Sequence, residues 1–459
     1  MCASHTFERM TACTLEEILA AREDRVRRRE ALIKKSGCPV LSMTMNIPGA
    51  VKDGPLIRRT FHAWLDLLWT ALEKSGASDA EIRYEKTGPE LLWALDIPAR
   101  ELKRHCIDLE GTDPAGRLAD LDVYDEKGHA VSRTELGFQE RPCILCGAPG
   151  RACAAGQMHP LSEVRAEAER RMRAFFSRKD PVHFAELAVS SLIMEARTTP
   201  KPGLVDGRNS GSHKDMDLRL MIRSAEALGP YFEACIRAGM DSGKKAPEET
   251  FPLLRKLGLE AEKTMFSVTD GVNTHKGAVY LFGILLGAFG RLWQADRFPE
   301  PEKMLLEGGK IASASVEEDL RTIGSLPDNA LTSGQRIYRD YGLRGARGEA
   351  ADGFPSVRLT ALPYLRAHRE EGRYQSILLH LIALGKDTNL IARCGFTDAK
   401  EAVEKVRALL SAGEPGLNAV EELDDWFIRK NLSPGGSADL LAVSIFCMLL
   451  ERASEKEFG

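Results

Sequence analysis

The segment LSEVRAEAERRMRAFFSRKDP (Leu161–Pro181) divides the chain into two parts with different sequence patterns. It is rich in Arg, Glu and Ala, and its Glu167–Arg171 pair has the i,i+4 spacing that supports a helix. Pro181 is expected to end this helix, because a proline inside a helix removes a backbone hydrogen bond. We therefore predict a helical linker over residues 161–181, between one domain at 1–160 and a larger one at 182–459.

Upstream of this linker, strand patterns alternate with turns and one helix. Val40–Ile47 alternates apolar and polar side chains, which is the period of a half-buried strand. Leu118–Tyr124 and Ala130–Arg133 flank a polar turn and predict a hairpin. Thr60–Ser75 has the apolar spacing of a helix. The first domain is therefore expected to be of the α+β class.

Downstream of the linker, wide apolar stripes predict a domain that is all α-helical. The predicted helices span Phe184–Ala196, Met216–Leu228, Pro252–Lys263, Ala278–Trp293, Tyr374–Leu384, Ala399–Leu410, Val420–Arg429 and Ser437–Ala453. The fold class is thus a multidomain protein, with an α+β domain followed by a larger all-α domain.

Composition and charge narrow the classes of function. The 459 residues are 43% hydrophobic and 28% charged, with a net charge of −4, so no overall basic field exists to hold nucleic acid. The longest apolar stretches are about half the ~20 residues that span a bilayer, and the start of the chain lacks a signal pattern. Seven of the ten cysteines are scattered, as is typical of reduced thiols. We expect a soluble, cytoplasmic protein without nucleic-acid or membrane partners.

Asp120 and Asp122 form a carboxylate pair on a predicted strand. Residues two apart on a strand point to the same side, so both carboxylates could hold Mg²⁺, which prefers oxygen ligands. Such an ion would neutralise a leaving pyrophosphate. The alternative is that the two side chains lie on a solvated strand face.

Three clustered cysteines and a histidine, Cys143, Cys146, Cys153 and His159, have spacings compatible with a tetrahedral zinc site. Only one C-x-x-C pair is present, which is weaker evidence than two such pairs. The alternatives are a redox-inert cluster, a family signature without metal, or a catalytic thiol.

Four segments of the first domain resemble one family when they are taken in order: Ser42–Lys52, Tyr84–Leu95, Gly116–Arg133 and Cys143–Cys153. The resemblance is to holo-citrate-lyase synthases, also called apo-citrate lyase phosphoribosyl-dephospho-CoA transferases, and it covers about residues 14–165. It implies transfer of a phosphoribosyl-dephospho-CoA group onto a serine of the small apo acyl carrier subunit of citrate lyase, with release of pyrophosphate. Arg117 and Lys52 are the cations that we assign to phosphate; otherwise they are ordinary surface cations.

Polar loops between the downstream helices carry a second set of candidates. Two His-Lys pairs stand near predicted helix starts, where free N–H groups and the helix dipole attract phosphate. A glycine-rich segment adds arginines, whose forked guanidinium groups suit phosphate oxygens. The candidate ligand-binding residues are Lys201, Lys214, Asn273, Lys276, Arg344 and Arg347. Each pair alone would more often be a surface feature, and no Walker or dinucleotide-binding motif is present.

Five segments of the second domain resemble the triphosphoribosyl-dephospho-CoA synthase family: Thr198–Asp217, Asp270–Val279, Tyr341–Val357, Lys386–Gly395 and Asn431–Val443. The resemblance covers about residues 182–455 and departs from the family's pattern at Gly207. It implies that the ribose 2′-hydroxyl of 3′-dephospho-CoA displaces adenine from ATP. The whole chain resembles the fused, bifunctional form of the two enzymes.

Cleavage of an N-glycosidic bond develops positive charge on the ribose, which a carboxylate can stabilise while it accepts the hydroxyl proton. The candidate carboxylates are Asp215, Asp217, Glu349 and Asp439, and His213 or His275 could protonate the departing adenine. Two alternatives stay open: the same chemistry for another carrier-dependent lyase or decarboxylase, or a non-catalytic nucleotide-binding module.

Overall fold

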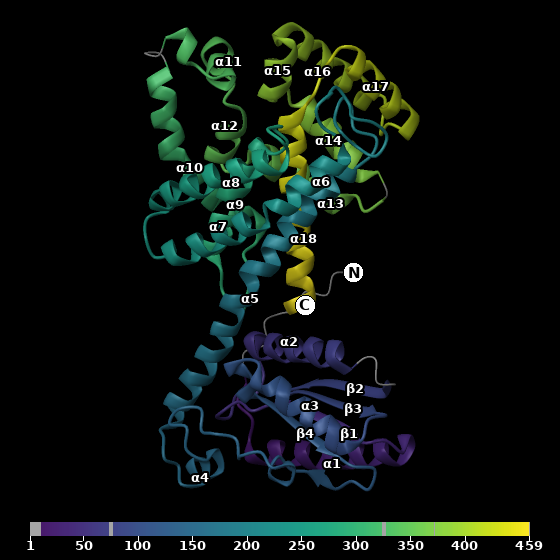
Figure 1. Ribbon diagram of the computed structural model, residues 1–459, viewed down its shortest axis with the longest axis vertical. Coiled ribbons are helices and arrows are strands. Elements are labelled where there is room, and N and C mark those ends of the chain that lie inside the picture. Colours follow the sequence, from purple (N-terminus) through teal and green to yellow (C-terminus); the bar gives the residue numbers. More distant parts are fainter. Residues whose placement is uncertain (1–10, 73–76, 324–326, 371, 459) are drawn as a thin grey trace. The chain divides into compact units, whose positions relative to one another are not determined.

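The computed structural model describes residues 11–72, 77–323, 327–370 and 372–458, so Cys2 lies outside the described residues. The chain forms two compact units (Figure 1). The N-terminal unit takes in Met1–Lys179, Ala295–Arg297 and Glu455–Gly459, and the C-terminal unit takes in Asp180–Gln294 and Phe298–Ser454. Among the described residues, no helix is long and apolar enough to cross a membrane.

A five-stranded antiparallel sheet is the centre of the N-terminal unit, with strand order β2-β3-β1-β4-β5. The strands are β1 (Val40–Met45), β2 (Ala77–Glu85), β3 (Gly88–Leu95), β4 (Ala119–Tyr124) and β5 (Ala130–Val131). The predicted first strand and the predicted β4–β5 hairpin are confirmed, whereas β2 and β3 were not predicted. Because β1 lies between β3 and β4, it is buried along almost its whole length.

Helices cover both faces of this sheet (Figure 1). The helix α1 (Leu15–Ser36) packs on one face, where Ile33 lies against Val40 and Leu92. On the other face lie α2 (Pro55–Leu72) and α3 (Ala99–Gly111). The remaining elements are η2 (Pro114–Leu118), η3 (Thr134–Leu136) and α4 (Gly150–Ala155). The α+β class is thus confirmed.

The helix α5 (Leu161–Arg197) differs from its predicted form, because it continues through Pro181 instead of ending there. Both sides of the proline bury apolar side chains. Phe175 stacks on Trp64 within the N-terminal unit, and Phe184 packs against Phe289 within the C-terminal unit. This burial offsets the one backbone hydrogen bond that a proline removes.

The C-terminal unit is helical, as predicted. Its α-helices are α6 (Leu218–Ala227), α7 (Gly229–Ser242), α8 (Phe251–Val268), α9 (Lys276–Leu292), α10 (Pro301–Thr322), α11 (Ser333–Tyr341), α12 (Gly345–Ala351), α13 (Leu362–Ala367), α14 (Arg373–Ala383), α15 (Thr388–Cys394), α16 (Phe396–Ser411), α17 (Leu417–Arg429) and α18 (Gly435–Phe458). Between them lie η4 (Pro247–Thr250), η6 (Asp328–Ala330) and the π-helical turn η7 (Val357–Ala361). The long apolar helix α9 is central to the core, and all its residues from Leu281 to Gly290 are buried.

Candidate functional site

The two carboxylates of β4 lie on the sheet face that α1 covers. Thr44 and Ser42 of β1 stand opposite Asp120 and Asp122, so the four residues share one face of the sheet. Although the Asp122 side chain reaches solvent, surrounding protein atoms and the negative charge of Asp120 raise the pKa of Asp122. A raised carboxyl pKa beside a second carboxylate marks a place where a cation would be stabilised.

Arginines that the sequence patterns did not single out surround this pair. The Arg141 guanidinium donates to Asp120 Oδ1 at 2.9 Å and contacts Glu110 at 2.8 Å. The guanidinium of Arg29, on α1, lies 3.6 Å above the ring of Tyr124, which is on the same face as the carboxylates. The site therefore combines two carboxylates with cations from two separate segments, one at Arg141 and one at Arg29.

The two predicted phosphate cations occupy different positions. Arg117 Nε donates to the carbonyl oxygen of Pro142 at 2.7 Å, while Arg117 Nη1 is buried without a partner, as is Nε of Arg29. Lys52 Nζ donates to the Ile47 carbonyl at 2.5 Å, and burial lowers its pKa. The two unpaired guanidinium nitrogens lack the hydrogen-bond acceptor that buried donors normally have, and a phosphate oxygen would supply one.

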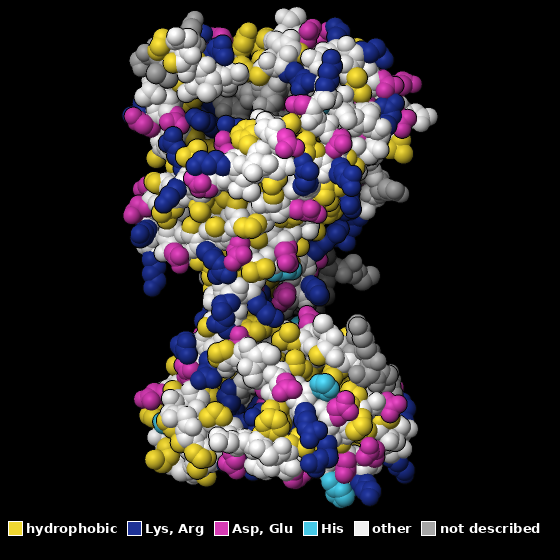
Figure 2. Space-filling view, in the orientation of Figure 1, with side chains coloured by type: hydrophobic (Ala, Val, Ile, Leu, Met, Phe, Trp, Pro, Cys, Tyr) yellow, Lys and Arg dark blue, Asp and Glu magenta, His cyan; other side chains and the backbone are white. Residues whose placement is uncertain are grey.

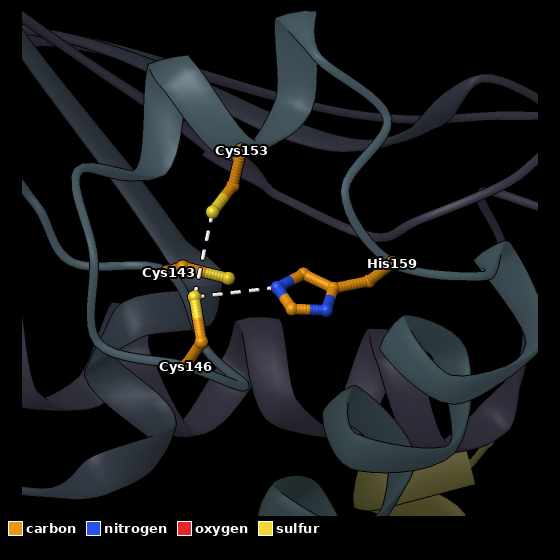
Figure 3. A group of neighbouring side chains, drawn as sticks. All are labelled: Cys143, Cys146, Cys153 and His159. Atoms are coloured by element: carbon orange, nitrogen blue, oxygen red, sulfur yellow. Dashed lines mark hydrogen bonds between the residues drawn. The ribbon is translucent and has the colours of Figure 1, made fainter.

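The structure brings together the four predicted zinc ligands (Figure 3). One ligand atom from each of Cys143, Cys146, Cys153 and His159 lies within 4.8 Å of the others. The Sγ atoms of Cys146 and Cys153 are 3.4 Å apart, and His159 Nε2 is 3.3 Å from Cys146 Sγ. Backbone N–H groups lower the pKa of Cys143 to about 6, although desolvation opposes the shift.

A cavity of about 1190 Å³ is the main feature of the C-terminal unit. All five of the segments singled out in the second domain contribute to its lining, although they are far apart in the sequence. The predicted residues that line it are Lys201, His213, Lys214, Asp215, Asn273, His275, Lys276, Arg344, Arg347, Glu349 and Asp439. Asp217 is outside this lining; its carboxylate caps α6 by accepting a hydrogen bond from Leu220 N at 2.8 Å.

Buried hydrogen bonds fix the first of these segments in place. Asp424 of α17 is fully buried and accepts hydrogen bonds from Gly203 N at 2.9 Å and from Arg208 Nη1 at 2.6 Å. Ser212 Oγ donates to the Leu432 carbonyl at 2.6 Å. The cavity wall is therefore rigid at this point, as a preorganised binding site requires.

Several cavity cations already have carboxylate partners. Lys276 Nζ is 2.9 Å from Glu262, and Arg347 Nη1 is 2.9 Å from Asp319. Lys201 differs from both, because its ammonium is buried and contacts the buried carboxylate of Glu195 at 2.5 Å. The exposed pairs can open to accept a phosphate at little cost, whereas the buried pair cannot.

Asp439 is the most strongly perturbed carboxylate of the cavity. Surrounding protein atoms, followed by the charges of Glu195 and Asp387, raise its pKa well above the usual range. A Cβ at Gly277 would lie 1.9 Å from Asp439 Oδ2, so only glycine permits this approach at the start of α9. Glu349 has a different role, because both its oxygens accept hydrogen bonds from Ser356.

The two histidines of the cavity have lowered pKa values, which favour the neutral ring. Burial lowers the pKa of His275 to about 4, and its Nδ1 is 3.0 Å from Ser224 Oγ while Nε2 is buried without a partner. Burial and the charge of Arg393 lower the pKa of His213, whose Nε2 is 2.8 Å from Ser433 Oγ. Near pH 7 these rings can give or accept hydrogen bonds, but they are poor sources of a full proton.

Sequence reasoning missed five residues of the two sites: Arg29, Arg141, Glu195, Tyr280 and Arg393. Glu195 and Tyr280 stand within apolar helices, where they resemble core residues. A charged residue inside an otherwise apolar stripe is the signal that could have identified Glu195. Figure 2 shows basic and acidic side chains interspersed over the visible face of each unit, so the anion sites are local.

Comparisons with known proteins match both units in order. Residues 13–175 match the family described as CitX, apo-citrate lyase phosphoribosyl-dephospho-CoA transferase, and residues 181–458 match CitG, ATP:dephospho-CoA triphosphoribosyl transferase. The chain is 36% identical to Protein CitXG of Haemophilus influenzae over 94% of this chain and 95% of that protein. It is 32% identical to Protein CitXG of Leuconostoc mesenteroides subsp. cremoris, over 96% and 98% respectively. A 2-(5''-triphosphoribosyl)-3'-dephosphocoenzyme-A synthase of Haemophilus ducreyi is 36% identical over 67% of this chain and 99% of its own length.

Proposed function

Because the chain belongs to the CitXG family, in which a CitX unit precedes a CitG unit, we propose that its two sites carry out consecutive reactions. The protein is a bifunctional transferase of citrate lyase prosthetic-group synthesis and attachment. Its C-terminal unit converts ATP and 3′-dephospho-CoA to 2′-(5″-triphosphoribosyl)-3′-dephospho-CoA and adenine. The observation that carries the assignment of this site is the convergence of five distant segments on one cavity.

The cavity of the C-terminal unit has the size and charge for the first reaction. Its volume of about 1190 Å³ exceeds the range of roughly 300–1,000 Å³ for single-ligand pockets, and so leaves room for two substrates. Lys276 and Arg347 would turn from Glu262 and Asp319 to the triphosphate. Asp439, whose pKa is raised, is the candidate that we favour to accept the proton of the attacking 2′-hydroxyl.

The carboxylate pair of the N-terminal unit is proposed for the second reaction, in which a carrier serine attacks the α-phosphorus and pyrophosphate leaves. Asp120 and Asp122 would hold Mg²⁺, which when bound would neutralise charge on the pyrophosphate. Their hard oxygen donors on one sheet face fit this ion. Arg117 and Arg29 would direct their unpaired nitrogens to phosphate oxygens. The proposed acceptor is the apo acyl carrier subunit of citrate lyase.

The cysteine cluster is proposed as a structural zinc site. Around a tetrahedral zinc, two sulfur ligands lie about 3.8 Å apart and a sulfur and a nitrogen about 3.5 Å apart, since Zn–S is about 2.3 Å and Zn–N about 2.0 Å. The Cys146–Cys153 separation of 3.4 Å and the Cys146–His159 separation of 3.3 Å are only a few tenths of an ångström shorter, so small side-chain shifts would give this arrangement. Metal analysis of the purified protein should find zinc, and Cys143→Ser together with Cys153→Ser should remove it. A zinc-free protein with unchanged thermal unfolding would contradict the proposal.

Mass spectrometry of the apo carrier tests the whole function. The carrier is incubated with this protein, ATP, 3′-dephospho-CoA and Mg²⁺, while released adenine is measured by chromatography. Both adenine and a carrier that is heavier by one phosphoribosyl-dephospho-CoA group are expected. If the citrate lyase carrier stays unmodified while the carrier of another lyase or decarboxylase is modified, the partner is wrong. If no adenine appears, the non-catalytic alternative stands. The cytoplasmic location stays a prediction from the scattered cysteines.

A further inference from the structure

A second cavity, of about 250 Å³, adjoins the main cavity of the C-terminal unit. Four residues line both of them: Glu262, Lys276, Tyr280 and Arg347. The rest of its wall comes mainly from apolar side chains of α8, α9 and α10, among them Leu254, Val279, Ile284 and Val316. The smaller cavity is thus an apolar side chamber whose entrance carries two cations.

The junction of the two cavities contains a buried hydroxyl group without a partner. Tyr280 Oη is buried and makes no hydrogen bond, and burial raises its pKa, so the phenol keeps its proton. The neighbouring Tyr231 is satisfied, because its hydroxyl donates to the Val279 carbonyl at 2.8 Å. A buried polar group with no partner usually indicates a missing ligand atom or water.

We propose that this smaller cavity holds the adenine base of ATP while the glycosidic bond breaks, with the Tyr280 hydroxyl donating a hydrogen bond to a ring nitrogen. The inference rests on the proposed function. The chamber suits a small flat base better than an extended pantetheine arm, and Val279 and Leu254 would contact the faces of the ring. With adenine inside, the ribose lies at the junction and the triphosphate reaches Lys276 and Arg347.

The reaction at this junction balances without any further reactant. The bond between ribose C1″ and adenine N9 breaks, and its electron pair stays with adenine. The 2′-hydroxyl oxygen of dephospho-CoA forms the new bond to C1″, and its proton passes through a cavity carboxylate to adenine. An apolar chamber around the base also excludes the water that would otherwise hydrolyse the ribosyl cation.

Two variants of the full chain test the inference. Tyr280→Phe removes the hydroxyl, and Gly258→Leu projects a side chain from α8 into the chamber, since Gly258 lines it. Each should lower kcat/KM for ATP, about tenfold for Tyr280→Phe, and weaken inhibition by added adenine, while KM for dephospho-CoA stays unchanged. The controls are Tyr364→Phe and Lys256→Leu, because Tyr364 and Lys256 line neither of these two cavities.

Hydrogen exchange of α8 and α9 reports on the folding of the C-terminal unit in each variant. Transfer of pre-made triphosphoribosyl-dephospho-CoA to the carrier shows that the N-terminal unit is unaffected, because that step uses the N-terminal unit. A rise in the KM for dephospho-CoA with an unchanged kcat/KM for ATP would assign the chamber to the pantetheine arm and overturn the inference. Variants that behave like their controls would overturn it as well. If the unchanged protein releases no adenine, the proposed function itself fails and the inference fails with it.

Discussion

Removal of the Lys201 ammonium should destabilise the C-terminal unit severely. The side chains of Lys201 and Glu195 are 1% and 5% exposed and lie 2.5 Å apart, so each neutralises the other in the protein interior. Loss of one partner from such a pair typically costs about 3–5 kcal/mol, because the other charge stays buried. Lys201→Met is therefore expected to lower the local free energy of unfolding by about that amount.

Hydrogen exchange in the full chain is the suitable measurement, because a protein with two units does not unfold in one two-state step. A loss of about 3–5 kcal/mol corresponds to roughly 100- to 4,000-fold faster exchange in α9 and the second half of α5. Burial already raises the pKa of Glu195, and removal of the lysine should raise it further. The loss of unfolding free energy in Lys201→Met should therefore be smaller at pH 5.5 than at pH 8. At pH 8, Glu195 must either stay charged without a partner or take up a proton from a solution that holds few.

The double variant Lys201→Met, Glu195→Gln provides the control, since it replaces the buried ion pair with neutral groups. Most of the lost protection should return. If Lys201→Met speeds exchange less than fivefold, or if the double variant is no more protected than the single one, the ion pair does not stabilise the unit as argued.

Three further predictions concern the sites. Asp122→Asn should abolish carrier modification while adenine release continues, as measured by mass spectrometry and chromatography; full transfer would refute the metal role. Lys276→Ala should raise the KM for ATP about 10- to 100-fold, because a charge-assisted hydrogen bond to phosphate contributes about 1.5–3 kcal/mol. The control Lys263→Ala should leave this KM unchanged, since it removes an exposed lysine of α8 that is paired with Glu260. Burial holds the pKa of His275 at about 4, below the value near 6.5 in an unfolded chain. The stabilisation by neutral His275 is therefore complete above pH 6.5 and is lost as the pH falls toward 4. Hydrogen exchange of α9 should show this loss, and a His275→Gln variant that shows the same loss would contradict the prediction.

Local patterns predicted the elements whose side chains follow one simple period. β1 and β4 alternate, and most of the long apolar helices were found. β3 was missed because Glu90 interrupts its apolar run, and this carboxylate is buried only because Arg25 and Arg28 of α1 pair with it. The missed helix α7 contains Gly239, where a Cβ would lie 2.1 Å from the Gly287 carbonyl oxygen of α9. That glycine permits close helix packing, which no local pattern reveals.

The candidate sites were predictable to a similar extent. Unusual polar residues within glycine-rich loops marked the segments that line the main cavity. The electrostatic state of those residues was not predictable, because it depends on partners from other helices, such as Glu262 for Lys276 and Glu195 for Lys201. Likewise, Asp217 stands in a polar segment typical of a binding site, but its side chain caps a helix. Only the backbone geometry reveals this role.

Because distant segments form one cavity, the two sites of the chain form at different times during synthesis on the ribosome. Its lining runs from Leu192 to Ala442, so about 250 residues must be made before the cavity can close. At roughly 5–20 residues per second, this takes on the order of 12–50 s after Leu192 has been added to the chain. The sheet that carries Asp120 and Asp122 is complete before that interval starts. In each new molecule, the carboxylates proposed to attach the prosthetic group are therefore in place before the cavity that is proposed to make it.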